Sequence, residues 1–216
     1  MIFSGKCPAE DSAGLSQERV SVMRTATVNR ETRETQIQLT LNLDGSGQTD
    51  IHSGIGFLDH MLTALAVHGG LDLALYCQGD LEVDCHHTIE DIGIVLGKAV
   101  GQCLGDKGGI RRYGNFTIPM DEALASCSLD VSGRPYLVFQ ADFSNERIGA
   151  MDCCMVEEFF RALAFHAGIT LHIQLHYGSN DHHKAEAIFK AVAHALREAV
   201  SRTEDNRTLS TKGALD

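Results

Sequence analysis

The sequence predicts an α/β (α+β) fold made by internal duplication, with helices packed between two small mixed β-sheets. The strongest sign is a histidine doublet that occurs twice, as HHTIE over residues 86–90 and HHKAE over residues 182–186. Each doublet opens an Ala/Gly-rich apolar segment with helical spacing, over about 86–104 and 182–200. A chain of 216 residues can bury a core of this kind without disulfide bonds.

The similarity extends upstream of both doublets. Residues 57–71 and 156–169 both read as short apolar helices, in which Gly70 matches Gly168. Polar and apolar residues alternate, as in half-buried strands, over four further segments: 35–43, 125–131, 71–75 and 169–175. Each half therefore reads as strands, helix, strand and helix.

The repeat sets the expected domain boundaries. A glycine-rich stretch over 105–109 separates the two halves, which we place at 23–107 and 108–200. Residues 1–22 are rich in Ser, Gly, Glu and Asp and are predicted to be a flexible leader. The polar residues 201–216 are predicted to form a C-terminal arm.

Composition narrows the function classes. The formal net charge is −11, which argues against nucleic-acid and membrane partners. The sequence has no apolar run near the roughly 18 residues of a membrane helix, and its start lacks the apolar core of a signal peptide. Seven irregularly spaced cysteines without a CxxC pair favour reduced thiols in a cytoplasmic protein over a disulfide framework.

The doublets predict two metal sites. On a helix, residues four apart share a face, whereas adjacent residues point about 100° apart. His86 with Glu90, and His182 with Glu186, can therefore each grip one ion, and the second histidine of each doublet points elsewhere. If the two equivalent helices lie side by side, each second histidine reaches the ion of the other helix.

The short helices complete these sites through His60 and its repeat partner Glu158. Imidazole and carboxylate ligands without thiolate suit Mn, Fe, Zn or Ni, and four ligands with exchangeable positions suit octahedral Mn²⁺. The two predicted four-ligand sets are His60, His87, His182 and Glu186, and Glu158, His86, Glu90 and His183.

Four ordered motifs together resemble the imidazoleglycerol-phosphate dehydratase family. They are GIGFLDHM at 54–61, DCHHTIED at 84–91, NDHHKAE at 180–186 and STKG at 210–213. The resemblance implies two Mn²⁺ per active site and a 24-subunit homo-oligomer with sites between subunits. It implies a hydro-lyase of histidine biosynthesis that converts D-erythro-imidazole glycerol phosphate into imidazole acetol phosphate. The family's ligands match both sets, although many members carry histidine at the position of Glu158.

The resemblance also assigns the residues that handle this small phosphorylated imidazole. Glu34 is expected to transfer a proton, with Glu186 as a second candidate. Arginines and the C-terminal arm are expected to hold the phosphate, for which the planar guanidinium fork is suited. The predicted substrate-binding set is Glu34, His60, His68, His86, His87, Glu90, Arg112, Arg134, His182, His183, Lys190, Ser210, Thr211 and Lys212.

Two other interpretations use the same doublets. A di-metal hydrolase would use these ligands to make a hydroxide nucleophile, but would not need the phosphate-binding residues. A non-catalytic metal-binding shell protein would keep the doublets without a positioned phosphate site. Replacing Lys212 would leave such a shell protein unharmed, whereas a lyase would lose phosphate-dependent binding.

Overall fold

The first half of the chain forms a mixed four-stranded sheet. The computed structural model describes residues 23–205, 207–213 and 215, so the predicted leader, residues 1–22, lies outside the described residues. The sheet has the order β1-β2-β4-β3, in which β3 is parallel to β4 and the other pairs are antiparallel. Its strands are β1 (Thr25–Glu31), β2 (Thr35–Asn42), β3 (Thr49–His52) and β4 (Asp72–Gly79).

The second half repeats this sheet. The order is β5-β6-β10-β7, again with one parallel pair, β7 with β10, at the same edge. Its strands are β5 (Tyr113–Met120), β6 (Ala123–Asp130), β7 (Tyr136–Gln140) and β10 (Thr170–Tyr177). A short hairpin of β8 (Arg147–Ile148) and β9 (Met151–Asp152) has no counterpart in the first half among the described residues.

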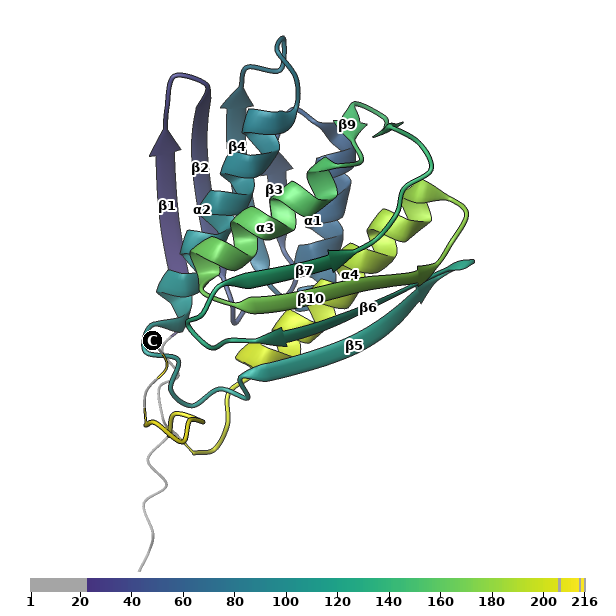
Figure 1. The fold of residues 1–216 in the computed structure, drawn as a ribbon. Helices are drawn as coiled ribbons and strands as arrows, with labels where there is room; N and C mark the ends of the chain where they lie inside the picture. Colours follow the sequence, from purple (N-terminus) through teal and green to yellow (C-terminus); the bar gives the residue numbers. More distant parts are fainter. Residues whose placement is uncertain (1–22, 206, 214, 216) are drawn as a thin grey trace, which may run out of the picture.

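Four helices fill the space between the two sheets (Figure 1). They are α1 (Gly56–Gly69), α2 (His86–Leu104), α3 (Met155–Ala167) and α4 (Asp181–Val200). This arrangement confirms the predicted fold class, a duplicated α/β unit with its helices between two small mixed sheets. The expectation that the two doublet helices lie side by side is wrong, because α2 packs against α3 and α4 packs against α1.

Two glycines of α2 explain why this helix packs closely against α3. A Cβ on Gly93 would lie 2.8 Å from the carbonyl oxygen of Phe159, and one on Gly97 would lie 2.7 Å from that of Leu163. Only a residue without a Cβ permits the two backbones to approach this closely. Each long helix therefore crosses the short helix of the other half, and the halves share one core.

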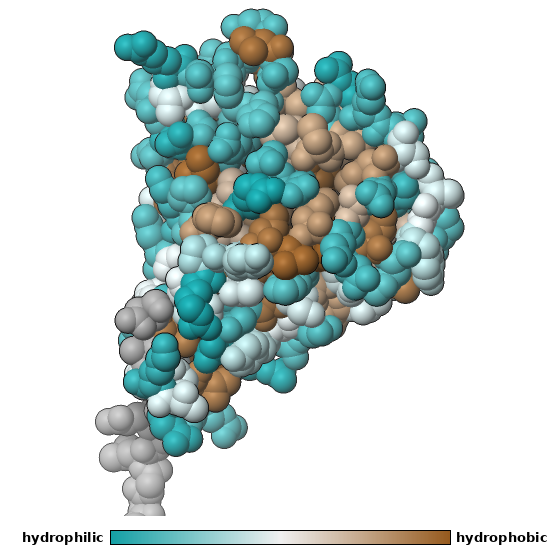
Figure 2. All heavy atoms as spheres, in the orientation of Figure 1, coloured by the Kyte–Doolittle hydropathy of each residue, from teal (hydrophilic) through white to brown (hydrophobic). Residues whose placement is uncertain are grey.

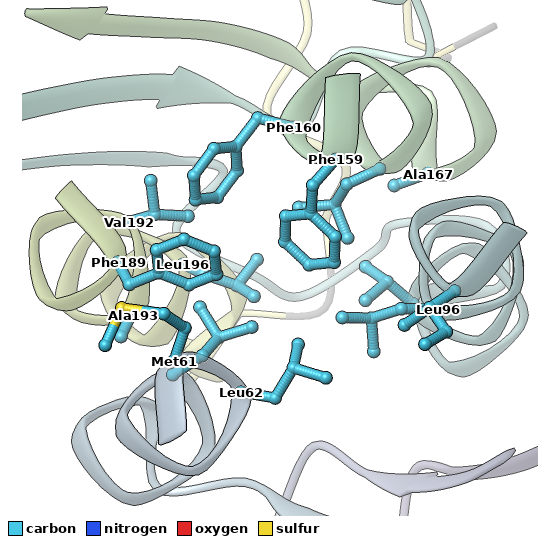
Figure 3. Close-up of a cluster of buried hydrophobic side chains, with 14 of the residues drawn as sticks. Met61, Leu62, Leu96, Phe159, Phe160, Ala167, Phe189, Val192, Ala193 and Leu196 are labelled. Atoms are coloured by element: carbon cyan, nitrogen blue, oxygen red, sulfur yellow. The ribbon is translucent and has the colours of Figure 1, made fainter. Parts of the chain in front are cut away.

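Aromatic and aliphatic side chains from all four helices form that core (Figure 3). Phe159 and Phe160 of α3 meet Phe189 of α4, with the ring centroids of Phe160 and Phe189 4.7 Å apart. Met61 and Leu62 of α1 are fully buried beside them. This packing holds the helices of the two halves against one another.

The face drawn in Figure 1 carries a mixture of hydrophilic and hydrophobic side chains. Figure 2 shows hydrophobic side chains gathered in the middle of this face and bordered by hydrophilic ones. Helix α3 crosses the face, and its Phe165 is 52% exposed. None of the helices that the structure describes is long and apolar enough to span a membrane.

Candidate active site

Both doublets stand in the first turn of their helices, and preceding side chains hold the backbone there. The N–H of His86 donates to the carboxylate of Asp84 at 2.7 Å, and the N–H of His182 donates to the side-chain oxygen of Asn180 at 2.9 Å. Contacts of this kind satisfy N–H groups that have no partner within the helix. They fix which way each doublet faces.

A buried ion pair supports the second doublet from below. Asp181 accepts from Lys184 Nζ at 2.8 Å, and their side chains are only 2% and 6% exposed. The backbone N–H groups of Ser144 and Asn145 also donate to Asp181, at 3.0 and 2.7 Å. Burial by itself raises the pKa of Asp181, but these donors outweigh it and hold the pKa at about 2. The carboxylate therefore ties the preceding loop to the start of α4.

Three predicted ligands meet between α1 and α4. The Nε2 atoms of His60 and His182 lie 3.5 and 3.3 Å from Oε2 of Glu186, and the ligand atoms of all three residues lie within 4.8 Å of one another. Among the described residues, no other trio of histidine, cysteine or carboxylate side chains meets this spacing. We call His60, His182 and Glu186 the α1–α4 trio.

The carboxylate of this trio is nearly buried and has a cation beside it. Lys190, one turn further along α4, donates to Glu186 at 2.7 Å. Burial by itself raises the pKa of Glu186, but the hydrogen bond from Lys190 and the nearby His60 outweigh it, so the pKa is lowered. Glu186 is therefore ionised at neutral pH, as a metal ligand must be.

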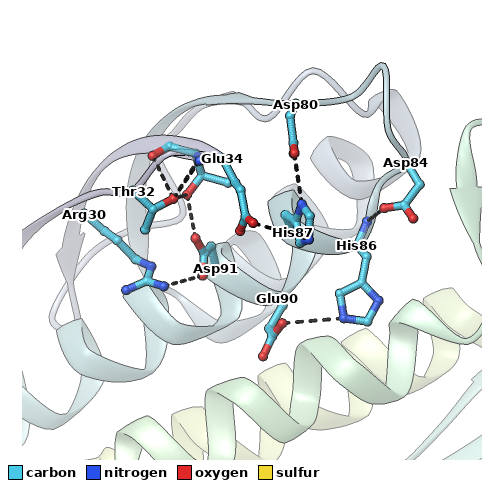
Figure 4. Close-up of polar contacts among 10 residues, drawn as sticks. Arg30, Thr32, Glu34, Asp80, Asp84, His86, His87, Glu90 and Asp91 are labelled. Carbon is cyan, nitrogen blue, oxygen red and sulfur yellow. Dashed lines mark hydrogen bonds and ion pairs between the residues drawn. The ribbon is translucent and has the colours of Figure 1, made fainter.

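His87, the fourth ligand predicted alongside the α1–α4 trio, lies beside Asp80 and not in the trio, and the other predicted ligand set is not assembled within one chain either. His86 and Glu90 face each other at 3.5 Å on α2 (Figure 4). Glu158, the repeat partner of His60, instead pairs with Arg161 at 3.4 Å. Arg161 also pairs with Glu157. A guanidinium next to Glu158 opposes a cation there, and the doublet pattern gave no sign of it.

The second histidine of each doublet has a carboxylate partner. Nδ1 of His87 lies 3.0 Å from Asp80, and Nδ1 of His183 lies 2.6 Å from Glu122 (Figure 4 shows the first pair). These hydrogen bonds raise the pKa of both histidines. The bond to His183, followed by the N–H of Asn180, lowers the pKa of Glu122 to about 2.

Glu34 occupies the turn between β1 and β2, near His87. Its Oε1 lies 3.9 Å from His87 Nε2, and the side chain is 53% exposed. Thr32 shapes the turn, because its hydroxyl accepts from the N–H groups of Glu34 and Thr35 at 3.1 and 2.9 Å. The Asp80 N–H donates to the Glu34 carbonyl at 3.1 Å, which joins the turn to the loop after β4.

Asp91 anchors the same turn to α2 (Figure 4). Its side chain is 9% exposed, accepts from the Thr35 hydroxyl at 2.5 Å and pairs with Arg30 at 2.8 Å. The hydrogen bond to Asp91 raises the pKa of Arg30. This network ties the strand that follows Glu34 to the helix that carries His87.

Basic side chains surround a cavity of about 1190 Å³ at the other end of the molecule. Arg134 and Lys212 line it and are exposed, and Ser210 and Thr211 of the arm lie beside them. Arg112 is already engaged, because it forms a two-pronged ion pair with Asp130 and donates to the carbonyl of Leu209 at 2.5 Å. Arg112 therefore holds the arm and β6 together at the cavity, in addition to contributing positive charge.

Comparison with known proteins agrees with the motifs. Residues 53–196 match the family model described as imidazoleglycerol-phosphate dehydratase. The chain is 61% identical over 199 residues to the protein of that name from Lactococcus lactis subsp. cremoris (strain SK11), covering 89% of this chain and 98% of the relative. It is 54% identical over 194 residues to the one from Clostridium kluyveri (strain ATCC 8527), covering 89% and 100%. The chain belongs to the imidazoleglycerol-phosphate dehydratase family.

Solved structures of imidazoleglycerol-phosphate dehydratases support the same assignment. The Staphylococcus aureus enzyme superposes with a TM-score of 0.76 at 44% identity, covering 83% of this chain and 99% of that one. The Pyrococcus furiosus enzyme, solved in complex with (S)-C348, has the same TM-score at 36% identity, covering 87% and 100%. The predicted family and enzyme class, a hydro-lyase, are confirmed, and the hydrolase and shell-protein interpretations lose their support.

Two further predicted substrate-binding residues lie on α1 and α4. Lys190 reaches the α1–α4 trio, where it contacts Glu186, and is not among the residues that line the basic cavity. His68 is half-buried with its ring 5.4 Å from that of His194, and burial, then Lys190 and His194, lower its pKa. Sequence reasoning missed Asp80, Glu122, Asp91 and Arg161. For Glu122 the sequence did contain a signal, because Glu122 directly precedes β6 just as Glu34, its counterpart in the repeat, directly precedes β2.

Proposed function

We propose that this chain dehydrates D-erythro-imidazole glycerol phosphate to imidazole acetol phosphate in histidine biosynthesis, with two Mn²⁺ per active site. The α1–α4 trio supports the metal, and the basic cavity supports a phosphorylated substrate. We place the reaction in the cytoplasm, where reduced thiols persist. The six described cysteines are free thiols, and five of them are buried.

The donor chemistry of the trio fits a divalent ion. Two imidazoles and an ionised carboxylate already converge, and they leave positions for further ligands. When bound, the two ions would act as Lewis acids that acidify the substrate imidazole. His86, Glu90 and His183 are the chain's remaining donors for the second ion, with Glu158 drawn off by Arg161.

The distance between the trio and the basic cavity within one chain supports a site shared between subunits. The trio lies at the start of α4, whereas the cavity lies near its end, where the N–H of the cavity residue Arg112 donates to the carbonyl of Ala199. From His183 to Ala199 a helix rises about 24 Å. A small phosphorylated imidazole cannot span that distance. We propose that the metal end of one subunit meets the cavity end of another, in a homo-oligomer of 24 subunits.

The chain's own residues then divide the remaining tasks. Arg134 and Lys212, with the hydroxyls of Ser210 and Thr211, hold the phosphate, and Arg112 keeps the cavity in shape through Asp130. Glu34 acts as the proton-transfer residue at the substrate carbons that react, because its exposed carboxylate lies next to a proposed metal ligand, His87. Glu186 remains a second candidate for this role.

Mixing two impaired variants tests the shared site. His182→Ala removes the metal end and Lys212→Ala weakens phosphate binding at the cavity end, so each pure variant should have little activity when the substrate concentration is far below the raised KM. Oligomers reassembled from both should regain about one quarter of wild-type activity, because that share of sites draws an intact end from each neighbour. His182→Ala mixed with Glu186→Gln is the matched control and should regain nothing. If the first mixture also stays inactive, the sites are not shared between subunits.

A further inference from the structure

The second histidines of the two doublets have the same surroundings, although different loops supply them. Nδ1 of His87 faces Asp80 at 3.0 Å, and Nδ1 of His183 faces Glu122 at 2.6 Å. Asp80 follows β4, whereas Glu122 precedes β6, so the two carboxylates are not repeat partners. Duplication of an ancestral half cannot by itself explain a contact made from non-equivalent loops. A requirement that both histidine rings be held in the same way does explain it.

We propose that Asp80 and Glu122 are positioning residues that hold His87 and His183 with Nε2 directed outward as metal ligands. The proposal rests on the metal dependence of the proposed function. A carboxylate that accepts Nδ1–H fixes the imidazole tautomer, leaves the lone pair on Nε2 and makes that nitrogen a stronger donor. The ring orientation is fixed at the same time.

Both carboxylates are held rigidly enough for this task. Glu122 also accepts from the backbone N–H groups of Ser179 and Asn180, at 3.1 and 2.7 Å. Asp80 is 20% exposed, and its backbone N–H donates to the carbonyl of Glu34. The Glu122 carboxylate is therefore held by the loop before α4, and Asp80 is anchored through its backbone.

The Nε2 atoms face a different environment from the Nδ1 atoms. They lie 3.9 Å from Glu34 and 3.7 Å from Asp121, beyond hydrogen-bond distance. Those two carboxylates are 53% and 71% exposed, and the side chains of His87 and His183 are themselves 35% and 25% exposed. One nitrogen of each ring is thus occupied and the other is available to a cation.

Titrating Mn²⁺ into assembled, metal-depleted protein tests the assignment without an activity assay. Asp80→Asn and Glu122→Gln keep the shape of the side chain and remove its charge. We expect each to weaken Mn²⁺ affinity about 10- to 100-fold by calorimetry. Glu82→Gln, an exposed carboxylate in the same loop as Asp80, is the matched control and should bind as the wild type does. Asp80→Glu and Glu122→Asp should recover part of the loss.

His87→Ala and His183→Ala separate this inference from the function on which it rests. If both leave Mn²⁺ affinity unchanged, these histidines are not ligands and the proposed metal set is wrong. If they weaken it while Asp80→Asn and Glu122→Gln match Glu82→Gln, the positioning role alone is overturned. Thermal unfolding and oligomer size are measured for every variant, and the two sites provide independent trials if one substitution prevents folding.

Discussion

Replacing Asp91 by asparagine tests whether the turn that carries Glu34 depends on its anchor to α2. The substitution keeps the shape of the side chain and removes its charge. Thr35 is 3% exposed and loses a charge-assisted hydrogen bond, whereas Arg30 is 31% exposed and can recruit water. Hydrogen bonds to charged groups contribute about 1.5–3 kcal/mol each. With the Arg30 bond discounted for solvent, Asp91→Asn should destabilise the protein by about 2–4 kcal/mol.

The measurable effects are a lower unfolding temperature and a lower kcat. For a domain of this size, about 2–4 kcal/mol corresponds to a fall of roughly 4–16 °C in the apparent Tm. A misplacement near 1 Å in a reacting group can cost about 100-fold in rate, so kcat should fall at least tenfold. Mn²⁺ affinity should stay near wild type, because Asp91 contacts Thr35 and Arg30 and no doublet histidine.

Threonine variants supply the controls. Thr35→Val removes the same hydrogen bond and should lower kcat with a smaller loss of Tm. Thr27→Val alters the exposed Thr27–Thr40 pair on the outer face of the same sheet and should change neither quantity. An Asp91→Asn enzyme with wild-type kcat would refute the reasoning, as would one whose Mn²⁺ affinity falls together with its activity.

Three more predictions concern the rest of the molecule. Asp181→Asn should lower the free energy of unfolding by about 3–5 kcal/mol, because it leaves the buried Lys184 ammonium without its partner. Asp181→Asn combined with Lys184→Met should be nearly neutral in thermal unfolding, and equal losses of stability in the two variants would contradict this. The pKa of Asp181 is about 2 when folded and 3.8 ordinarily, so its contribution of about 2 kcal/mol is present above pH 4 and lost as pH falls through 2. Acid unfolding of metal-free wild type should be steeper there than that of Asp181→Asn, and identical curves would exclude the pair. Lys212→Ala should raise KM more than it lowers kcat in steady-state assays, and an unchanged KM would remove it from the phosphate site.

Local pattern was enough to predict much of the fold. The helical spacing after each doublet predicted α2 and α4, and the glycines at 70 and 168 end α1 and α3 in the left-handed conformation. The pairing of helices was not predictable in this way. It depends on Gly93 and Gly97, whose close approach to α3 is a property of the assembled core. None of the four edge strands, β1, β3, β5 and β7, was predicted. For β3 and β7 the reason is that they are short and pair in parallel with distant segments.

The site, too, was predictable where it depends on local pattern and not where it depends on distant loops. The rule that residues four apart share a helix face predicted His182 with Glu186, and the short helix before the first doublet supplied His60, which the structure places beside them. The carboxylates that meet His87 and His183 come from loops far away along the chain, and no local pattern points to them. Arg161 lies one turn after Glu158, but an exposed arginine at that spacing reads as an ordinary helix ion pair.

Metal dependence of the dehydration is the most direct test of the proposed function. The protein is stripped of metal, and conversion of imidazole glycerol phosphate to imidazole acetol phosphate is measured before and after Mn²⁺ is restored. We expect no turnover without metal, and recovery that saturates at about two bound ions per subunit. Full turnover by the metal-free protein, or two bound ions without any turnover, would contradict the proposed function.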